Sequence, residues 1–359
     1  MFDVFYGSII VMSNITSKEM GMETDSVLRS DPLNCDYLFV EGKLARLNNE
    51  RDWKGIVIEG SKAVSIYSEK RHALHSDELI ASVRDLSMFS GSLLRCGKNP
   101  IVEIPGLETS LVDASQRGQT TPYHTVFHYS TLNPIGLRER NFTGTKQEHI
   151  FINQVRRGVE GFTHSAQALW LIFTNEVSHE DSLLAPELFS IAHIGLEQGI
   201  SAIPVVMKEV GAEYFARNLR PYFDPLEIEG RVFDAPGGAQ MPLLLVDHIL
   251  WASDTEEHTY DSFRDRNLIY LPQNMREAIA TTLGTPSLRS RVGEVSSTTE
   301  ATGLVKSLIT RVYTFRKAHE RLAKDSFGYR VENAIGSGGS TPDLLNELSA
   351  ITRAKMQVD

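Results

Sequence analysis

The chain contains few cysteines and no excess of positive charge. Only two cysteines, Cys35 and Cys96, occur in 359 residues, too few for a disulfide scaffold or for a metal site made of thiolates alone. Lysine and arginine total 36 against 46 aspartates and glutamates, a formal net charge of −10. Non-specific binding of nucleic acid or anionic lipid needs the opposite sign. We therefore expect no nucleic-acid partner, no membrane partner and a cytoplasmic location.

The sequence is also expected to lack an apolar stretch that approaches the length of a membrane-spanning helix. The segment Met1–Met12 resembles a secretory signal only faintly, because no basic flank accompanies it. Met12, Met20 and Met22 are alternative native starts. Residues 1–30 are therefore expected to be poorly ordered or a non-native start.

The composition, 41% hydrophobic and 23% charged, is that of a folded protein with a sizeable core. Apolar residues recur mostly at helical spacing, and long alternating patterns are scarce. Helices are predicted over 76–96, 146–178, 186–219, 241–252, 260–283, 298–327 and 342–356, and short extended segments at 56–67 and 121–133. The fold class is predicted to be mostly α, with a smaller N-terminal helical region over 31–135 and a larger helical domain over 136–359.

Prolines and polar residues refine the predicted helix ends. Pro204 lacks a backbone N–H and clashes one turn back, so it ends or kinks its helix. Ser340 and Asp343 have the spacing of a capping box, and Pro342 suits the first turn of the last helix.

Three loops are rich in glycine, at 229–230, 236–240 and 336–340. Glycine before a helix permits close approach of a ligand to the backbone. None of these loops carries the Lys-Ser/Thr of a phosphate loop or lies between a strand and a helix as in a dinucleotide fingerprint. Each one taken alone favours a turn over a ligand site.

The eleven histidines form no HExxH motif, no HxH cluster and no Cys/His pair, which argues against a zinc hydrolase or deaminase. No Gly-x-Ser-x-Gly elbow or kinase signature occurs. The absence of Cys-x-x-Cys-His excludes covalently attached c-type haem. Cys96 follows an apolar helical segment, and we interpret it as a packed thiol.

His319 differs from the other histidines because it follows Leu308, Val312 and Phe315 along one helical seam, with Leu322 beyond it. A buried imidazole with one free nitrogen suits a metal or haem ligand. Periodicity alone favours a core histidine bonded to a backbone carbonyl. The glycine-rich loop at 336–340, downstream of His319, favours instead the role of His319 as a metal or haem ligand.

The remaining candidates have ordinary structural interpretations. His248 lies on an apolar face, and the adjacent Asp247 points about 100° away, so His248 is predicted to be structural. His124 and His128, four residues apart, could share a helix face and bind a metal, but their surroundings look extended, which would separate them. His164 and His193 are predicted to be core or surface residues. Arg220 precedes a proline, where it either pairs with a ligand carboxylate or caps helix carbonyls, and the cap is favoured.

Several segments together resemble the monodechloroaminopyrrolnitrin synthase family. They are Leu219–Leu226, Gly237–Leu243, Asp247–Ser253, Arg316-x-x-His319 and Gly336–Gly339, with shorter matches at Gly91–Leu93, Pro105–Glu108, Asn133–Pro134 and Phe142–Gly144. The similarity runs in order from about residue 31 to about 355. That family looks like a divergent branch of the indoleamine and tryptophan 2,3-dioxygenases, which are all-α proteins with a histidine-ligated b-type haem.

The resemblance implies that His319 is the proximal ligand of haem b, in a haem-binding domain over 136–359. It implies that Ser337 holds the substrate's amino-acid end or the haem edge and that Arg220 pairs with the substrate carboxylate. It further places Gly336, Gly338 and Gly339 at the cofactor and Tyr329 at the substrate. One departure is that the family's active-site tyrosine, eight residues past the ligand histidine, is replaced here by Phe327.

The resemblance implies a haem-dependent oxidoreductase that uses dioxygen and L-tryptophan, or its 7-chloro derivative, and rearranges the indole toward an aminophenylpyrrole, as in pyrrolnitrin-type antibiotic biosynthesis. One alternative is dioxygenation or hydroxylation of tryptophan or another aromatic amino acid. A non-catalytic haem sensor and a helical interaction protein without a cofactor are further alternatives. An external electron donor is left open as a partner.

Overall fold

The computed structural model describes residues 24–174, 185–294, 299–329, 336 and 338–357. The described part is mostly helical, which confirms the predicted fold class. Its strands are the short hairpin of β1 (Leu226–Ile228) and β2 (Arg231–Phe233), which pair antiparallel with Glu227 opposite Val232. The start that was expected to be poorly ordered lies largely outside the described residues.

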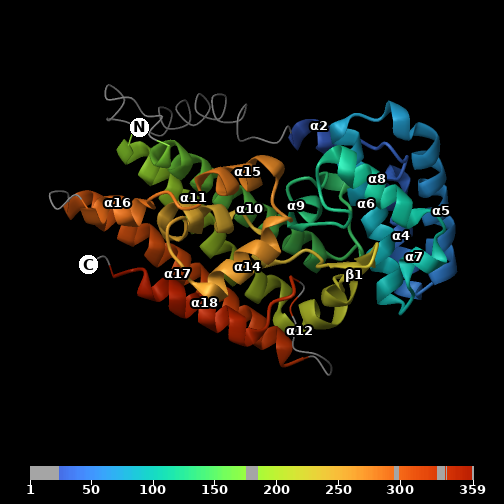
Figure 1. Cartoon of the computed structure of the whole chain (residues 1–359). Helices are drawn as coiled ribbons and strands as arrows, with labels where there is room; N and C mark the ends of the chain where they lie inside the picture. Colours follow the sequence, from blue (N-terminus) through green and yellow to red (C-terminus); the bar gives the residue numbers. More distant parts are fainter. Residues whose placement is uncertain (1–23, 175–184, 295–298, 330–335, 337, 358–359) are drawn as a thin grey trace, which may run out of the picture.

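The first helices gather at one end of the elongated molecule (Figure 1). They are α2 (Thr24–Arg29), α3 (Asp36–Val40), α4 (Lys43–Glu50), α5 (Trp53–Lys70), η1 (Arg71–Ala73), α6 (Ser76–Arg95), α7 (Pro100–Glu103), α8 (Leu107–Gly118), α9 (Val126–Tyr129) and η2 (Gly136–Arg138). Helix α6 packs on α5 and α8 and forms the centre of this group.

Longer helices build the other end of the molecule (Figure 1). They are α10 (Lys146–Phe173), α11 (Ala185–Val205), α14 (His258–Leu268), α15 (Gln273–Thr282), α16 (Leu288–Glu294), α17 (Thr299–Phe327) and α18 (Pro342–Ala354). Shorter pieces connect them: η4 (Val206–Val210), α12 (Ala212–Tyr214), η5 (Phe215–Leu219), η6 (Arg220–Tyr222), η7 (Gly238–Gln240), α13 (Leu243–Asp247) and η8 (His248–Ala252). Helix α11 packs between α10 and α17, and α18 packs on α17.

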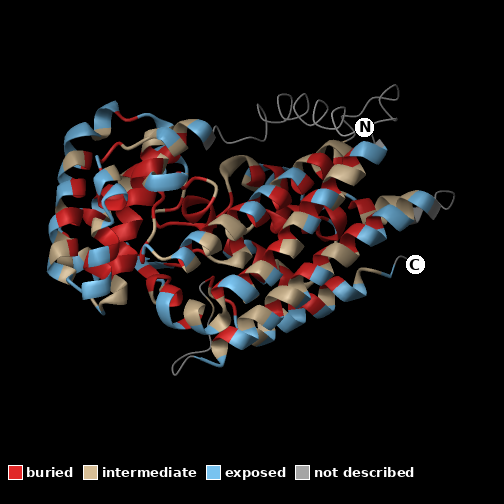
Figure 2. Cartoon of the chain, turned by 180° about the vertical axis from the view of Figure 1, so that it is seen from behind, coloured by how far each residue is buried: buried red, intermediate tan, exposed pale blue. Residues whose placement is uncertain are grey.

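Two hydrophobic cores lie inside these groups, and Figure 2 shows the buried residues along the inner faces of the helices. One core joins α10, α11, α13 and α17, and it also includes Ala81 of α6 and Val126 of α9. The other joins α4, α5, α6 and α8, and it also includes Ile152 of α10 and Leu219 of η5. Residues from both sides of position 135 therefore contribute to each core, and the division of the chain at that position stays a prediction.

Helices α10 and α11 approach closely because glycines face each other. A side-chain carbon at Gly195 would collide with the backbone oxygen of Gly161, and one at Gly161 would collide with the oxygen of Gly195. Ser165 adds a hydrogen bond of 2.7 Å from its Oγ to the backbone oxygen of Ala192. This contact sets the position of α10, which forms one wall of the pocket described below.

Helix α11 with η4 also corrects an expectation from the sequence. The segment Pro186–Val210 is long and apolar enough to cross a membrane by length and composition, so the expectation of no such stretch was wrong. The segment packs on α10 and α17, as a core helix does. Pro204 lies one residue before the α-helix ends, as predicted, and the chain continues as the π-helical turn η4.

Other corrections concern local structure. The segment 56–67 is not extended but belongs to α5, where Ile56, Gly60 and Ala63 are buried at helical spacing. The β-branched residues of Ile56-Val-Ile favoured a strand, but the longer period over α5 decides. The segment 121–133 forms no strand, because Thr125 caps the short helix α9 by accepting a hydrogen bond from the N–H of Phe127.

The predicted helix 260–283 is interrupted before Pro272, because α14 ends at Leu268 and α15 begins at Gln273. The predicted cap of the last helix was displaced by one residue. Thr341, not Ser340, accepts a hydrogen bond of 3.2 Å from the N–H of Leu344. The hairpin of β1 and β2 was not predicted from the sequence.

A buried charge network ties α6 to the loop before α10. Asp85 accepts hydrogen bonds of 2.8 Å from Nε of Arg84 and 2.9 Å from Nε of Arg140. Burial alone raises the pKa of Asp85, but the two guanidinium groups outweigh it and lower the pKa to about 2. The ionised carboxylate therefore holds both cations in place.

Candidate active-site pocket

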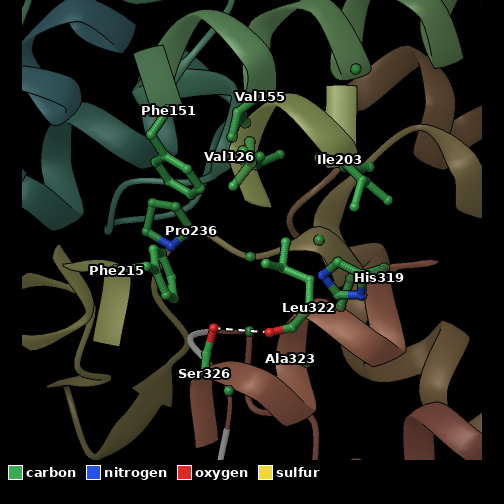
Figure 3. Close-up of a pocket in the computed structure, with 18 of the residues that line it drawn as sticks. Val126, Phe151, Val155, Ile203, Phe215, Pro236, His319, Leu322, Ala323 and Ser326 are labelled. Carbon is green, nitrogen blue, oxygen red and sulfur yellow. Dashed lines mark hydrogen bonds between the residues drawn. The ribbon is translucent and has the colours of Figure 1, made fainter. Parts of the chain in front are cut away.

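A large apolar pocket lies where α10, α11, α17 and the glycine-rich loops meet (Figure 3). It encloses about 1330 Å³ of space free of atoms, its opening to solvent included. Most lining side chains are apolar. They include Val126, Phe151, Val155, Ala202, Ile203, Phe215, Phe223, Pro236, Phe315, Leu322, Ala323 and Phe327.

His319 lies on α17 and lines this pocket, opposite the residues of α10 and α11 (Figure 3). Its ring is nearly parallel to that of Phe315 one turn earlier, with 5.9 Å between ring centroids. Burial lowers the pKa of His319, so the imidazole is neutral at physiological pH. Within the described residues, neither ring nitrogen makes a hydrogen bond, so the alternative of a core histidine bonded to a carbonyl has no support there.

The first residue of η7, Gly238, lies against the ring of His319. A side-chain carbon placed on Gly238 would lie 2.9 Å from Nε2 of His319 and 3.1 Å from Cε1. Real Cβ atoms essentially never approach this closely, so glycine is required here for the ring to keep its position. The absence of a side chain at Gly238 therefore leaves the space that the imidazole of His319 occupies.

A buried ion pair lies behind His319. A second, smaller cavity is lined by His319, Asp247 and Arg316 among apolar residues. Asp247 accepts hydrogen bonds from both terminal nitrogens of Arg316, from Nε1 of Trp251 at 3.1 Å and from the hydroxyl of Tyr260 at 3.2 Å. Burial raises the pKa of Asp247 and Arg316 opposes that shift. The pair joins α13 to the turn of α17 that carries His319.

Arg220 lines the pocket from η6, and its side chain is only 6% exposed. Its Nη1 donates to the backbone oxygen of Phe223 at 2.8 Å and to Oδ1 of Asp224 at 2.7 Å. The first bond is to the carbonyl of the residue that follows η6. The side chain of Asp224 is 47% exposed. If another carboxylate takes its place at Arg220, water can therefore solvate the carboxylate of Asp224.

The glycine-rich loop at 336–340 contributes to the pocket only in part. Gly336 and Gly338 line it. Gly339 is not among its lining residues. A side chain at Gly339 would collide with Arg266 and Asp234, and its φ of +69° also favours glycine. The prediction that Gly339 contacts the cofactor is therefore not supported by this geometry. Ser337 lies outside the described residues.

Two aromatic residues at the end of α17 differ in position. Phe327 lines the pocket, without a hydroxyl group. Tyr329 is 46% exposed and is not among the lining residues, so the geometry gives no support to its prediction as a substrate-binding residue.

The rival histidines are internal, and two of them, His248 and His128, make hydrogen bonds to the protein. His248 is fully buried, and its Nε2 lies 2.8 Å from Oγ1 of Thr282, in line with the structural role predicted for it. His128 accepts a hydrogen bond of 3.1 Å from the backbone N–H of Thr125 through Nδ1. Burial lowers the pKa of both His124 and His128 to about 3. The described residues contain no group of three or more potential metal ligands.

Several pocket residues were not singled out from the sequence. Phe151, Gln154, Val155 and Gly158 of α10 line the pocket together. Their spacing of three, four and seven residues is that of one helical face. Periodicity therefore indicates that they share a face, but it does not indicate that this face borders a pocket. Tyr129 of α9 also lines the pocket and donates a hydrogen bond of 2.9 Å to the buried carboxylate of Glu148.

The pocket lies within the part of the chain that matches a known family. The model of the family described as Monodechloroaminopyrrolnitrin synthase PrnB matches residues 55–359. That range contains all but the first two residues of α5, the elements from η1 to α18 and every pocket residue named above. The chain therefore belongs to the monodechloroaminopyrrolnitrin synthase PrnB family, a family of enzymes.

Proposed function

We propose that this protein is a haem b enzyme that acts with dioxygen on L-tryptophan or 7-chloro-L-tryptophan and rearranges the indole into an aminophenylpyrrole. Membership of a synthase family supports an enzymatic role of this kind. The observation that carries the proposal is His319, a neutral imidazole without a hydrogen bond to any described residue, at the wall of a large apolar pocket.

The residues of the pocket fit a histidine-ligated haem. A neutral imidazole nitrogen is the form that binds iron, and burial keeps His319 in that form. Apolar walls suit the faces of a porphyrin, and Gly238, Gly336 and Gly338 bring backbone without side chains to its edge. Haem bound there would supply the iron that activates dioxygen.

The Asp247–Arg316 pair is proposed to keep His319 in place. Four hydrogen-bond donors converge on the Asp247 carboxylate, one of them from the ring of Trp251. Arg316 precedes His319 by three residues, so a bond that fixes Arg316 also fixes this turn of α17. The imidazole is thereby held toward the pocket without a direct bond to its ring.

Arg220 is proposed to bind the substrate carboxylate. It is the charged residue among the described residues that line the pocket, and its guanidinium matches a carboxylate in shape and charge. The apolar walls exclude water, which strengthens that ion pair. Phe151 and Phe215, with 5.1 Å between ring centroids, offer aromatic faces to an indole ring.

The reaction demands little acid–base chemistry from side chains. Conversion of tryptophan into an aminophenylpyrrole releases carbon dioxide and two hydrogen atoms, a net two-electron oxidation with dioxygen as acceptor. The protein's contribution is then to orient the substrate and to exclude water. The apolar lining of the pocket is consistent with that role.

Phe327 favours a second candidate, oxygenation of tryptophan or another aromatic amino acid in the same pocket. It occupies the position at which the family resemblance places an active-site tyrosine, and it lines the pocket without a hydroxyl group. Loss of a hydrogen bond to the substrate changes its orientation, and orientation decides which product forms.

The first experiment is the absorption spectrum of the protein reconstituted with haem, recorded beside His319→Ala and before and after addition of L-tryptophan. We expect a Soret band in the wild type that shifts with tryptophan. We expect weak or absent haem binding in His319→Ala, restored by free imidazole, because the missing side chain leaves room for it. A wild type without a Soret band contradicts the proposal.

Product analysis then separates the two candidate reactions. Incubation with tryptophan, dioxygen and a reductant, followed by mass spectrometry, distinguishes an aminophenylpyrrole from N-formylkynurenine and from hydroxylated tryptophan. An aminophenylpyrrole supports the rearrangement, and either oxygenated product supports the second candidate. Haem binding without a spectral response to any aromatic amino acid would instead indicate a sensor.

A further inference from the structure

We propose that Gln154 recognises the substrate by accepting a hydrogen bond from the N–H of its aromatic ring. Gln154 would thus make the pocket specific for an aromatic amino acid whose ring carries such a donor. This inference rests on the proposed function, because it names the residue that selects the substrate of that same pocket.

Gln154 is a polar residue on the otherwise apolar face of α10. It lies between Phe151 and Gly158 on that face, and all three line the pocket. The Oε1 atom of Gln154 is buried and has no hydrogen-bond partner. Gln154 as a whole is half-buried, and its amide nitrogen is not among the buried atoms without a partner, so the unsatisfied atom is the oxygen.

A buried amide oxygen without a partner requires an explanation, because buried polar atoms are nearly always hydrogen-bonded. Leaving one unpaired costs free energy that a ligand can recover by bonding to it. Since no protein group fixes the orientation of this amide, rotation of its terminal group lets a ligand meet either the oxygen or the nitrogen. Gln154 is therefore suited to a ligand that enters the pocket.

Two other polar side chains of the pocket, those of Tyr129 and Ser326, are already engaged. The hydroxyl of Tyr129 donates to Glu148 at 2.9 Å. The hydroxyl of Ser326 donates to the backbone oxygen of Leu322 at 2.9 Å, the dashed line in Figure 3. A neutral N–H donor that enters the pocket thus meets an unengaged buried acceptor at Gln154.

Position favours the ring N–H over the charged end of the substrate. The carboxylate has a cationic partner in Arg220 on η6, whereas Gln154 is uncharged and lies on α10. The neighbours of Gln154 on that helix, Phe151 and Val155, are apolar and flank the site expected for the ring (Figure 3). A neutral amide beside apolar walls suits a neutral N–H on an aromatic ring.

The experiment compares two ligands that differ in the ring donor. L-tryptophan and its benzothienyl analogue, which carries sulfur in place of the ring N–H, are titrated into the haem-loaded wild type and Gln154→Leu, and each Kd is taken from the spectral shift. We expect the wild type to prefer tryptophan at least about tenfold, because the analogue leaves the buried acceptor unpaired. We expect Gln154→Leu to reduce this preference to within about twofold.

Gln167→Leu is the matched control, because Gln167 lies on the same helix and is not among the pocket's lining residues. It should keep the wild-type preference. The inference on Gln154 is overturned if Gln154→Leu keeps the preference or if the wild type shows none. If the wild type binds neither haem nor tryptophan, the proposed function fails and the inference on Gln154 fails with it. A Soret band in the wild type therefore distinguishes failure of the inference alone from failure of the proposed function.

Discussion

A side-chain carbon on Gly238 would lie 2.9 Å from Nε2 of His319. The two residues are far apart in sequence, and the position of the imidazole depends on the missing side chain at Gly238. We predict that Gly238→Ala lowers haem affinity at least about tenfold, because the ring must turn away or the loop must shift, and overpacking of this kind costs about 1–3 kcal/mol. Haem titration followed at the Soret band measures this.

Gly303→Ala is the control for this substitution. Gly303 lies on α17, the helix that carries His319, and a side-chain carbon there meets open space. Its replacement should leave haem affinity unchanged and stabilise the helix slightly. Equal haem affinity in Gly238→Ala and the wild type would show that the loop does not constrain the ring.

We predict that Arg316→Leu destabilises the protein by about 3–5 kcal/mol, because it leaves the Asp247 carboxylate buried without its charged partner. The double variant Asp247→Asn/Arg316→Leu should recover part of this loss, since the asparagine removes the uncompensated charge. Urea unfolding without added haem gives the free energies. A double variant no more stable than Arg316→Leu would indicate that the buried charge is not the cause.

We predict that stability falls as the pH drops below about 6.5, the usual pKa of histidine. The pKa of His128 in the folded protein is lowered to about 3, so between these values the unfolded chain binds a proton that the native state does not. Unfolding then becomes more favourable by about 1.4 kcal/mol per pH unit for this residue. Urea unfolding at pH 7 and pH 5 measures the fall.

His128→Gln isolates this contribution. Glutamine is a common residue at the third position of a capping box, so it can keep the bond to the N–H of Thr125. Between pH 7 and pH 5 the variant should lose about 2 kcal/mol less than the wild type. An equal loss in both proteins would assign the pH dependence to other groups.

We predict that Arg220→Met weakens the binding of tryptophan about 30-fold or more, because it removes a buried partner of the carboxylate. Tryptamine lacks the carboxylate, and its affinity should change by less than about threefold. Spectral titration of both ligands measures the difference. Equal losses for the two ligands would mean that Arg220 acts only as the cap of the Phe223 carbonyl.

Local patterns along the sequence were sufficient to predict most helices and the principal candidate residue. Leu308, Val312, Phe315 and His319 lie on one face of α17 because their spacing follows the helical period, which depends only on the chain itself. At α5 the short β-branched run Ile56-Val-Ile led to the wrong prediction of a strand, although Ile56, Gly60 and Ala63 are buried at the same helical spacing.

Approaches between distant segments were decided only by the tertiary structure. The contact of Gly238 with His319 joins segments far apart in sequence, and so does the approach of Arg266 and Asp234 to Gly339. The position of the unpartnered Oε1 of Gln154 at the pocket likewise depends on how the helices pack. Their residue types were visible, but no local period relates them. The sequence by itself determined a helical protein with His319 on a buried face. Only the packing of α10, α11 and α17 determined that this face borders a pocket, because a cavity exists where several elements meet.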